Sequence, residues 1–61
     1  MRRFKLKKNA VLSRAKWLNR EGTYEGKLIS MTSRIVRLFA PNPMEIQQSV
    51  DISYDWVIPV R

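Results

Sequence analysis

An alternating pattern from Met44 to Val60 constrains the fold more than any other feature of this 61-residue chain. Successive side chains of a β-strand point to opposite faces of the sheet, so alternation of apolar and polar residues predicts a half-buried strand. Eight of the nine even positions are apolar or aromatic, whereas most odd positions between Glu45 and Asp55 are polar. The side chains predicted to face the core are Met44, Ile46, Gln48, Val50, Ile52, Tyr54, Trp56, Ile58 and Val60.

The length of this pattern predicts that it bends or breaks. About 17 residues in one straight strand would span roughly 56 Å, whereas a compact chain of this size has a radius of gyration of about 10 Å. Ser53-Tyr54-Asp55 is the expected break, because Ser and Asp side chains hydrogen-bond to the local backbone. We expect two short strands, or one sharply bent strand, that keep a single inward face and close a small barrel.

Three further segments favour strands. Alternation in Arg3–Lys7 directs Phe4 and Leu6 inward, unless the basic N-terminus is a frayed arm. The segment from Tyr24 to Met31 holds an interior glycine, Gly26, which predicts a bulge or a sharp bend. The segment from Arg34 to Phe39 is rich in β-branched and long side chains, and the two prolines of Ala40–Pro43 end it.

The segment 10–21 has two interpretations. As a helix it would begin after Asn9 and end before Gly22. As a strand it would place Ala15 and Trp17 on one face, and we favour the strand. The fold class predicted is therefore all-β, a small barrel of about five strands, with a short N-terminal helix as the alternative. We expect one domain over 1–61, with residues 1–9 as a basic arm or first strand and 10–61 as the barrel.

Composition limits the class of protein. A chain this short buries only about 60% of the surface exposed on unfolding, and it has no cysteine or histidine for disulfides or a structural zinc site. We therefore expect either a homo-oligomer or a larger protein partner as a source of stability, or a small monomer with a well-packed aromatic core. No apolar run is long enough for a signal peptide or a membrane span. We expect a cytoplasmic or intravirion protein.

The net charge of +7 is concentrated near the N-terminus. Residues 1–20 contain eight basic residues and no acid, and such a zone attracts polyanions, of which nucleic acid is the commonest. Trp17 follows Lys16 and lies close to Arg14 and Arg20, which makes it the best candidate for an exposed aromatic residue, and an exposed indole could stack on a base. The predicted nucleic-acid-binding residues are Arg2, Arg3, Lys5, Lys7, Lys8, Arg14, Lys16, Trp17 and Arg20.

The residue types do not predict catalysis. Without His or Cys, the usual general bases, nucleophiles and transition-metal ligands are absent. Asp51 and Asp55 are two of only five carboxylates, and we interpret them as part of a solvated face. We therefore expect a protein that is not an enzyme and has no cofactor, no metal site and no catalytic residues.

Several segments resemble the SH3-like small barrels, and among these the Sm-like proteins, including bacterial Hfq. If the chain is similar to them, the resemblance implies RNA binding and a ring of subunits. Tyr54-Asp55 stands where Hfq-type proteins have a polar pair that grips RNA. The resemblance therefore assigns no RNA-binding residue to this chain. The matching segments are Leu18–Gly22, Gly26–Leu28, Ile35–Leu38, Val50–Ile52 and Trp56–Val60.

Two functions follow as hypotheses. The first is a small basic module that binds nucleic acid, RNA or single-stranded, by gripping phosphates with its N-terminal basic residues. The alternative is a small viral or mobile-element protein that binds and regulates or inhibits a larger host protein machine. In that case the edge of the long final strand would extend the partner's sheet.

Overall fold

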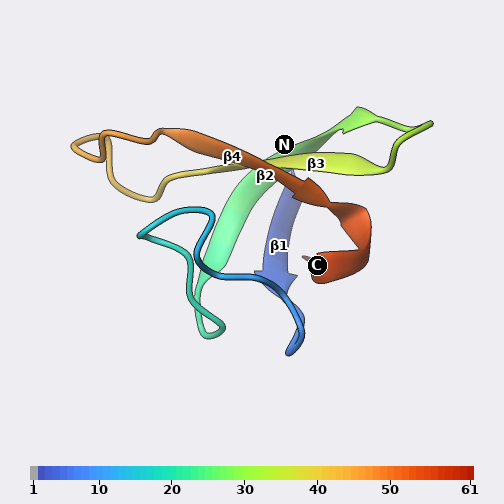
Figure 1. The fold of residues 1–61 in the computed structure, drawn as a ribbon, viewed down its shortest axis with the longest axis horizontal. Helices are drawn as coiled ribbons and strands as arrows, with labels where there is room; N and C mark the ends of the chain where they lie inside the picture. Colours follow the sequence, from blue (N-terminus) through green and yellow to red (C-terminus); the bar gives the residue numbers. More distant parts are fainter. Residues whose placement is uncertain (1) are drawn as a thin grey trace.

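The computed structural model describes residues 2–61, which form one antiparallel sheet of five strands (Figure 1). The all-β prediction is confirmed. The strands lie in the order β4-β3-β2-β1-β5, and a single turn of 3-10 helix, η1, joins β4 to β5. The bounds are β1 Arg2–Leu6, β2 Thr23–Ser30, β3 Ile35–Phe39, β4 Ser49–Ser53, η1 Tyr54–Trp56 and β5 Val57–Val60.

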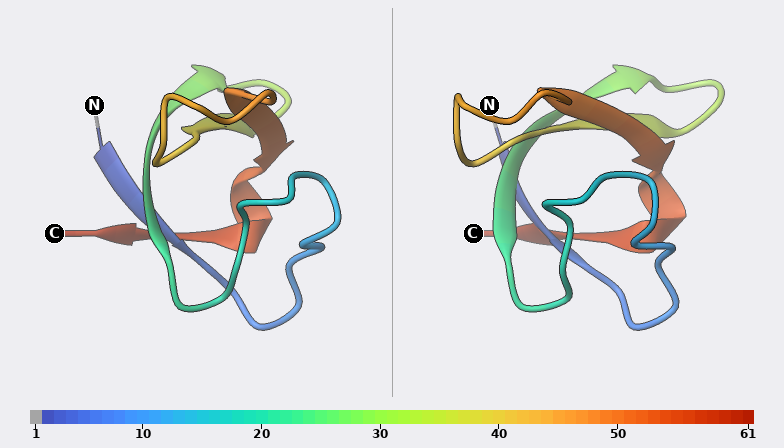
Figure 2. Two further views of the ribbon diagram at one scale, coloured as in Figure 1. Left: turned by 90° about the vertical axis from the view of Figure 1, so that its left-hand side faces the viewer. Right: turned by 60° about the vertical axis from the view of Figure 1, so that its left-hand side comes forward.

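The sheet curls into an arch but does not close into a barrel (Figure 2). The two strands that would close it, β4 and β5, are the edges of the sheet, and no ladder joins them within residues 2–61. The chain passes directly from β4 through η1 to β5, which pairs with β1 on the far side. The predicted closed barrel is therefore corrected to an open, strongly bent sheet.

The core lies on the concave face of the arch. Alternate residues of the strands point to this face. On β1 these are Phe4 and Leu6, as the alternation in the sequence predicts. Gly26 is buried on the same face, and the expected bulge lies further along β2, between Leu28 and Ser30. The buried apolar side chains are Phe4, Leu6, Ala10, Ala15, Trp17, Leu18, Tyr24, Val36, Leu38, Val50, Ile52 and Val57.

The segment 10–21 is neither strand nor helix, so both interpretations of it were wrong. It belongs to an irregular loop between β1 and β2 that lies across the open side of the arch (Figure 2). The buried hydroxyl of Tyr24 donates a hydrogen bond to Trp17 O (2.8 Å) and accepts one from Asn19 N (2.9 Å). These side-chain hydrogen bonds satisfy backbone groups that a ladder or a helix would otherwise pair.

The C-terminal pattern breaks where the sequence predicts, but it does not keep one inward face. η1 occupies the predicted break, and the Ser53 hydroxyl accepts a hydrogen bond from Asp55 N (3.2 Å). The three residues of η1 shift the alternation, so that Val57 is buried and Ile58 is 48% exposed. Met44 and Ile46 lie in the loop before β4 and are exposed, which contradicts their predicted inward position.

Within residues 2–61, no helix has the length and apolar character needed to cross a membrane.

Candidate functional site

Five of the predicted basic residues form one exposed surface, which we name the β1 strip. Alternation along β1 sends Arg3 and Lys5 to the convex face, and Lys7 and Lys8 follow at the end of the strand. The β1–β2 loop then returns Arg20 to this place, where its Nε donates a hydrogen bond to Lys8 O (3.0 Å). The β1 strip consists of Arg3, Lys5, Lys7, Lys8 and Arg20.

The cations of the β1 strip are not neutralised by ion pairs. The ion pairs within residues 2–61 are Arg34–Asp55 and Arg37–Asp51, and neither includes a member of the strip. Two acids adjoin the strip: Glu25 lies opposite Arg3 in the β1–β2 register, and Glu21 follows Arg20 in the chain. The strip is therefore a positively charged surface of exposed side chains.

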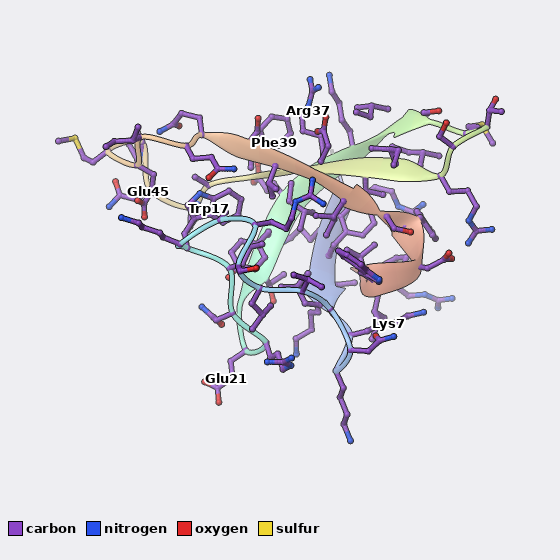
Figure 3. The ribbon with its side chains drawn as sticks, in the orientation of Figure 1. Lys7, Trp17, Glu21, Arg37, Phe39 and Glu45 are labelled. Atoms are coloured by element: carbon purple, nitrogen blue, oxygen red, sulfur yellow. The ribbon has the colours of Figure 1, made fainter. Side chains whose placement is uncertain are left out.

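Arg14 and Lys16 are separated from the β1 strip. They lie in the part of the loop that packs near the loop before β4, and in Figure 3 Lys7 is well away from Trp17 and Glu45. Arg14 Nη2 donates a hydrogen bond to Asp51 O (2.9 Å), so its guanidinium helps to hold the loop against the edge of β4. The structure thus places Arg14 and Lys16 apart from the other predicted basic residues.

Trp17 is not the exposed aromatic that the sequence predicts. Its side chain is 8% exposed, and its Nε1 donates a hydrogen bond to Gln47 O (2.7 Å). The indole also packs against Tyr24 with ring centroids 5.4 Å apart. A small core needs this aromatic bulk, and the burial of Trp17 excludes its ring face from the role of an open stacking platform.

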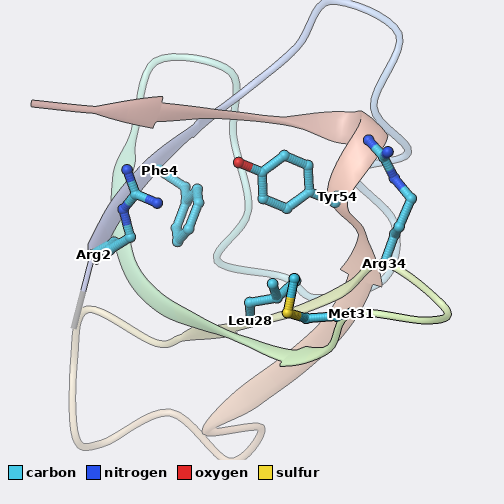
Figure 4. A pocket seen from close by; sticks show the side chains of 6 residues that line it. All are labelled: Arg2, Phe4, Leu28, Met31, Arg34 and Tyr54. Atoms are coloured by element: carbon cyan, nitrogen blue, oxygen red, sulfur yellow. The ribbon is translucent and has the colours of Figure 1, made fainter.

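Arg2 points to the concave face and lines a separate pocket of about 310 Å³ (Figure 4). Because Arg2 and Phe4 are two residues apart on β1, their side chains lie on the same face of the sheet. The end of β2, the β2–β3 turn and η1 supply the other walls. The lining residues are Arg2, Phe4, Leu28, Met31, Arg34 and Tyr54.

Tyr54 is the centre of this pocket. The Phe4 ring meets it edge-on, with ring centroids 6.4 Å apart and an interplanar angle of 80°. The Arg34 guanidinium lies 5.5 Å from the Tyr54 ring centroid and forms an ion pair with Asp55 (2.8 Å). Sequence reasoning missed this arrangement, because Arg2, Arg34 and Tyr54 are far apart in the chain and show no common motif.

The ion pair between Arg37 and Asp51 crosses the convex face between β3 and β4. Arg37 Nε donates to Asp51 Oδ1 (2.8 Å), and Arg37 Nη2 donates to Asp51 Oδ2 (3.2 Å). These hydrogen bonds hold the pKa of Asp51 below its ordinary value, and partial desolvation opposes the shift. This pair joins two strands and leaves the β1 strip unneutralised.

Residues 2–61 contain no cluster of three His, Cys, Asp or Glu side chains that could hold a metal ion. Comparisons of the chain with protein-family models, with curated proteins and with solved structures found no match.

Proposed function

We propose that this chain binds nucleic acid through its phosphates, with the β1 strip as the contact surface and RNA or single-stranded nucleic acid as the ligand. The observation that supports this proposal is the gathering of five exposed cations on β1 and the adjoining loop, none of which forms an ion pair with another residue of 2–61. Lys and Arg side chains that contact phosphates release condensed counterions, and this release drives binding without sequence readout.

The spacing of the β1 strip suits an extended ligand. Residues two apart on a strand are separated by about 6.8 Å, so Arg3 and Lys5 form a row along β1, and Lys7 follows directly after the strand ends. A polyanion can follow this row, whereas a compact anion would contact only part of it. The row therefore favours a nucleic-acid backbone over a small anionic ligand.

The strand order and the position of η1 support the SH3-like part of the resemblance. A bent sheet in the order β4-β3-β2-β1-β5, with a 3-10 turn before the last strand, is compatible with a small barrel-like fold. The Sm-like part, with a ring of subunits, is a finer proposal that rests on the sequence alone. The binding proposal does not depend on a ring.

The structure gives less support to a partner that extends the sheet. At the β4 edge, Arg14 and Gln47 side chains already donate hydrogen bonds to the carbonyl oxygens of Asp51 and Ser49. At the other edge, Pro59 in β5 has no N–H to donate. Both edges are thus poorly prepared for strand addition, and we favour nucleic acid over the regulatory protein hypothesis.

Two double variants of equal charge test the proposal by fluorescence anisotropy with a labelled single-stranded RNA in low salt. Lys7→Ala/Lys8→Ala removes two charges from the β1 strip, whereas Lys16→Ala/Lys27→Ala removes two exposed lysines outside it. We expect the strip variant to lose about tenfold in affinity and the control to lose much less. Equal losses would contradict a localised site, and an absence of binding by the unmodified protein would remove the proposed function.

A further inference from the structure

Arg34 occupies a backbone conformation that an arginine seldom adopts. Its φ is 54°, in the left-handed region where Gly, Asn and Asp are preferred and other side chains are disfavoured. Its backbone carbonyl accepts a hydrogen bond from Tyr54 N (2.7 Å), which would be available to any residue at this position. The conformation itself therefore does not require an arginine.

The contacts of the Arg34 side chain within the protein do not account for its presence either. Its ion pair with Asp55 joins two exposed side chains, 61% and 67% accessible, and exposed ion pairs contribute little to stability. The guanidinium also lies 5.5 Å from the Tyr54 ring centroid, and a cation–π contact at an exposed site is likewise weak. Unfavourable backbone conformations at such positions are common where a side chain serves a binding site. A role for the Arg34 guanidinium toward a ligand explains why the position is not Gly or Asn.

The pocket beside Arg34 combines two kinds of surface. Tyr54 and Phe4 supply aromatic rings, and Leu28 and Met31 add apolar side chains that are 41% and 81% exposed. The Arg2 and Arg34 side chains lie on opposite sides of these rings (Figure 4). This arrangement suits a ligand that is flat and apolar in one part and negatively charged in another.

A nucleotide has these two parts, a flat base and an anionic phosphate. The pocket volume of about 310 Å³ is at the lower end for ligand sites, so it suits one base and not a run of stacked bases. Arg2 and Arg3 are neighbours at the start of β1 and point to its two faces, so the pocket and the β1 strip meet at this end of the strand.

We propose that this pocket binds the base of one unpaired nucleotide, packed against Tyr54 and the Arg34 guanidinium, while Arg2 contacts an adjacent phosphate. This inference rests on the proposed function and adds to it a preference for single strands that carry an accessible base. Base contacts of this kind with aromatic and arginine side chains are common in single-strand binding.

The test compares a short single-stranded RNA with an oligomer of the same length that lacks one central base but keeps every phosphate. We expect the intact RNA to bind about tenfold more tightly, because one base–aromatic contact is lost in the abasic oligomer. Arg34→Asn should abolish this preference while leaving the affinity for the abasic oligomer almost unchanged. Lys27→Asn, which removes one charge from the convex face, should keep the preference.

The same variant separates a ligand contact from a structural role. Asn accepts the left-handed conformation, so Arg34→Asn should unfold at a temperature equal to or above that of the unmodified protein. Equal binding of the two oligomers would overturn the pocket proposal and leave the β1 strip intact as a binding surface. A retained preference in Arg34→Asn would also overturn it. Failure of both oligomers to bind would reject the proposed function itself.

Discussion

Gly26 lies on β2 where β1 and β3 pack closely against it. A Cβ atom at this position would lie 2.7 Å from Arg37 O, 2.8 Å from Leu38 Cδ2 and 3.1 Å from Phe4 Cδ2. The first of these atoms belongs to the backbone of β3 and has little freedom to move. The glycine therefore allows the packing of β1, β2 and β3 that forms the arch.

Gly26→Ala should lower the free energy of unfolding by about 1–3 kcal/mol, because the added methyl group overpacks the centre of the sheet. Urea unfolding followed by tryptophan fluorescence measures this change. Lys27→Ala, at the next position on the convex face, is the matched control and should have almost no effect. A Gly26→Ala protein as stable as the control would contradict the close approach.

The Arg37–Asp51 ion pair predicts a pH dependence of stability. Because the pKa of Asp51 is lowered in the folded state, the pair stabilises the fold above the unfolded pKa of about 3.9 and loses this effect as the pH falls through the folded value. Asp51→Asn should therefore be slightly less stable than the unmodified protein at pH 7. The difference should disappear in acid. A difference that stays constant between pH 7 and pH 2 would exclude this origin.

At the scale of elements, η1 decides which side chains of the C-terminal segment are buried. The sequence predicts the break at Ser53-Tyr54-Asp55, because Ser and Asp side chains can bond to the local backbone, and the Ser53 hydroxyl does accept a hydrogen bond from Asp55 N. Sequence did not predict the length of the turn, and three residues are enough to exchange the positions of Val57 and Ile58. Alternation alone also could not show that β4 begins only at Ser49.

Ile46 and Ile52 belong to the same alternating pattern but differ in burial, which gives a matched test. Ile52 is 2% exposed, whereas Ile46 is fully exposed in the loop before β4. Ile52→Ala should lower the free energy of unfolding by about 2–5 kcal/mol, and Ile46→Ala should leave it nearly unchanged. If urea unfolding showed equal losses of stability in the two variants, Ile46 would be buried like Ile52, as the continuous alternation in the sequence predicts.

The β1–β2 loop was the element least predictable from sequence. Its conformation depends on residues distant in the chain, since Gln47 O accepts from Trp17 and Asp51 O accepts from Arg14. Local patterns of 10–21 fit both a helix and the strand that the sequence favours, and neither includes these contacts. The same contacts bury Trp17, so the residue that was predicted to stack on a base does not have an open ring face.

For the whole molecule, the distribution of charge was the more predictable part of the site. The alternation of Arg3–Lys7 with Phe4 and Leu6 is a local pattern, and it placed Arg3 and Lys5 on the outer face. The pocket of Arg2, Arg34 and Tyr54 arises only when β1, the β2–β3 turn and η1 come together. One surface thus follows from local sequence and the other from the tertiary fold.

The most direct test of nucleic-acid binding by the β1 strip is the salt dependence of affinity for a short single-stranded RNA. Each phosphate contact in a single strand contributes about −0.7 to the slope of log K against log salt concentration. Lys5→Ala/Lys7→Ala/Lys8→Ala should therefore reduce the magnitude of the slope by about 2. A slope equal to that of the unmodified protein would show that these lysines do not contact phosphate and would contradict nucleic-acid binding by the β1 strip.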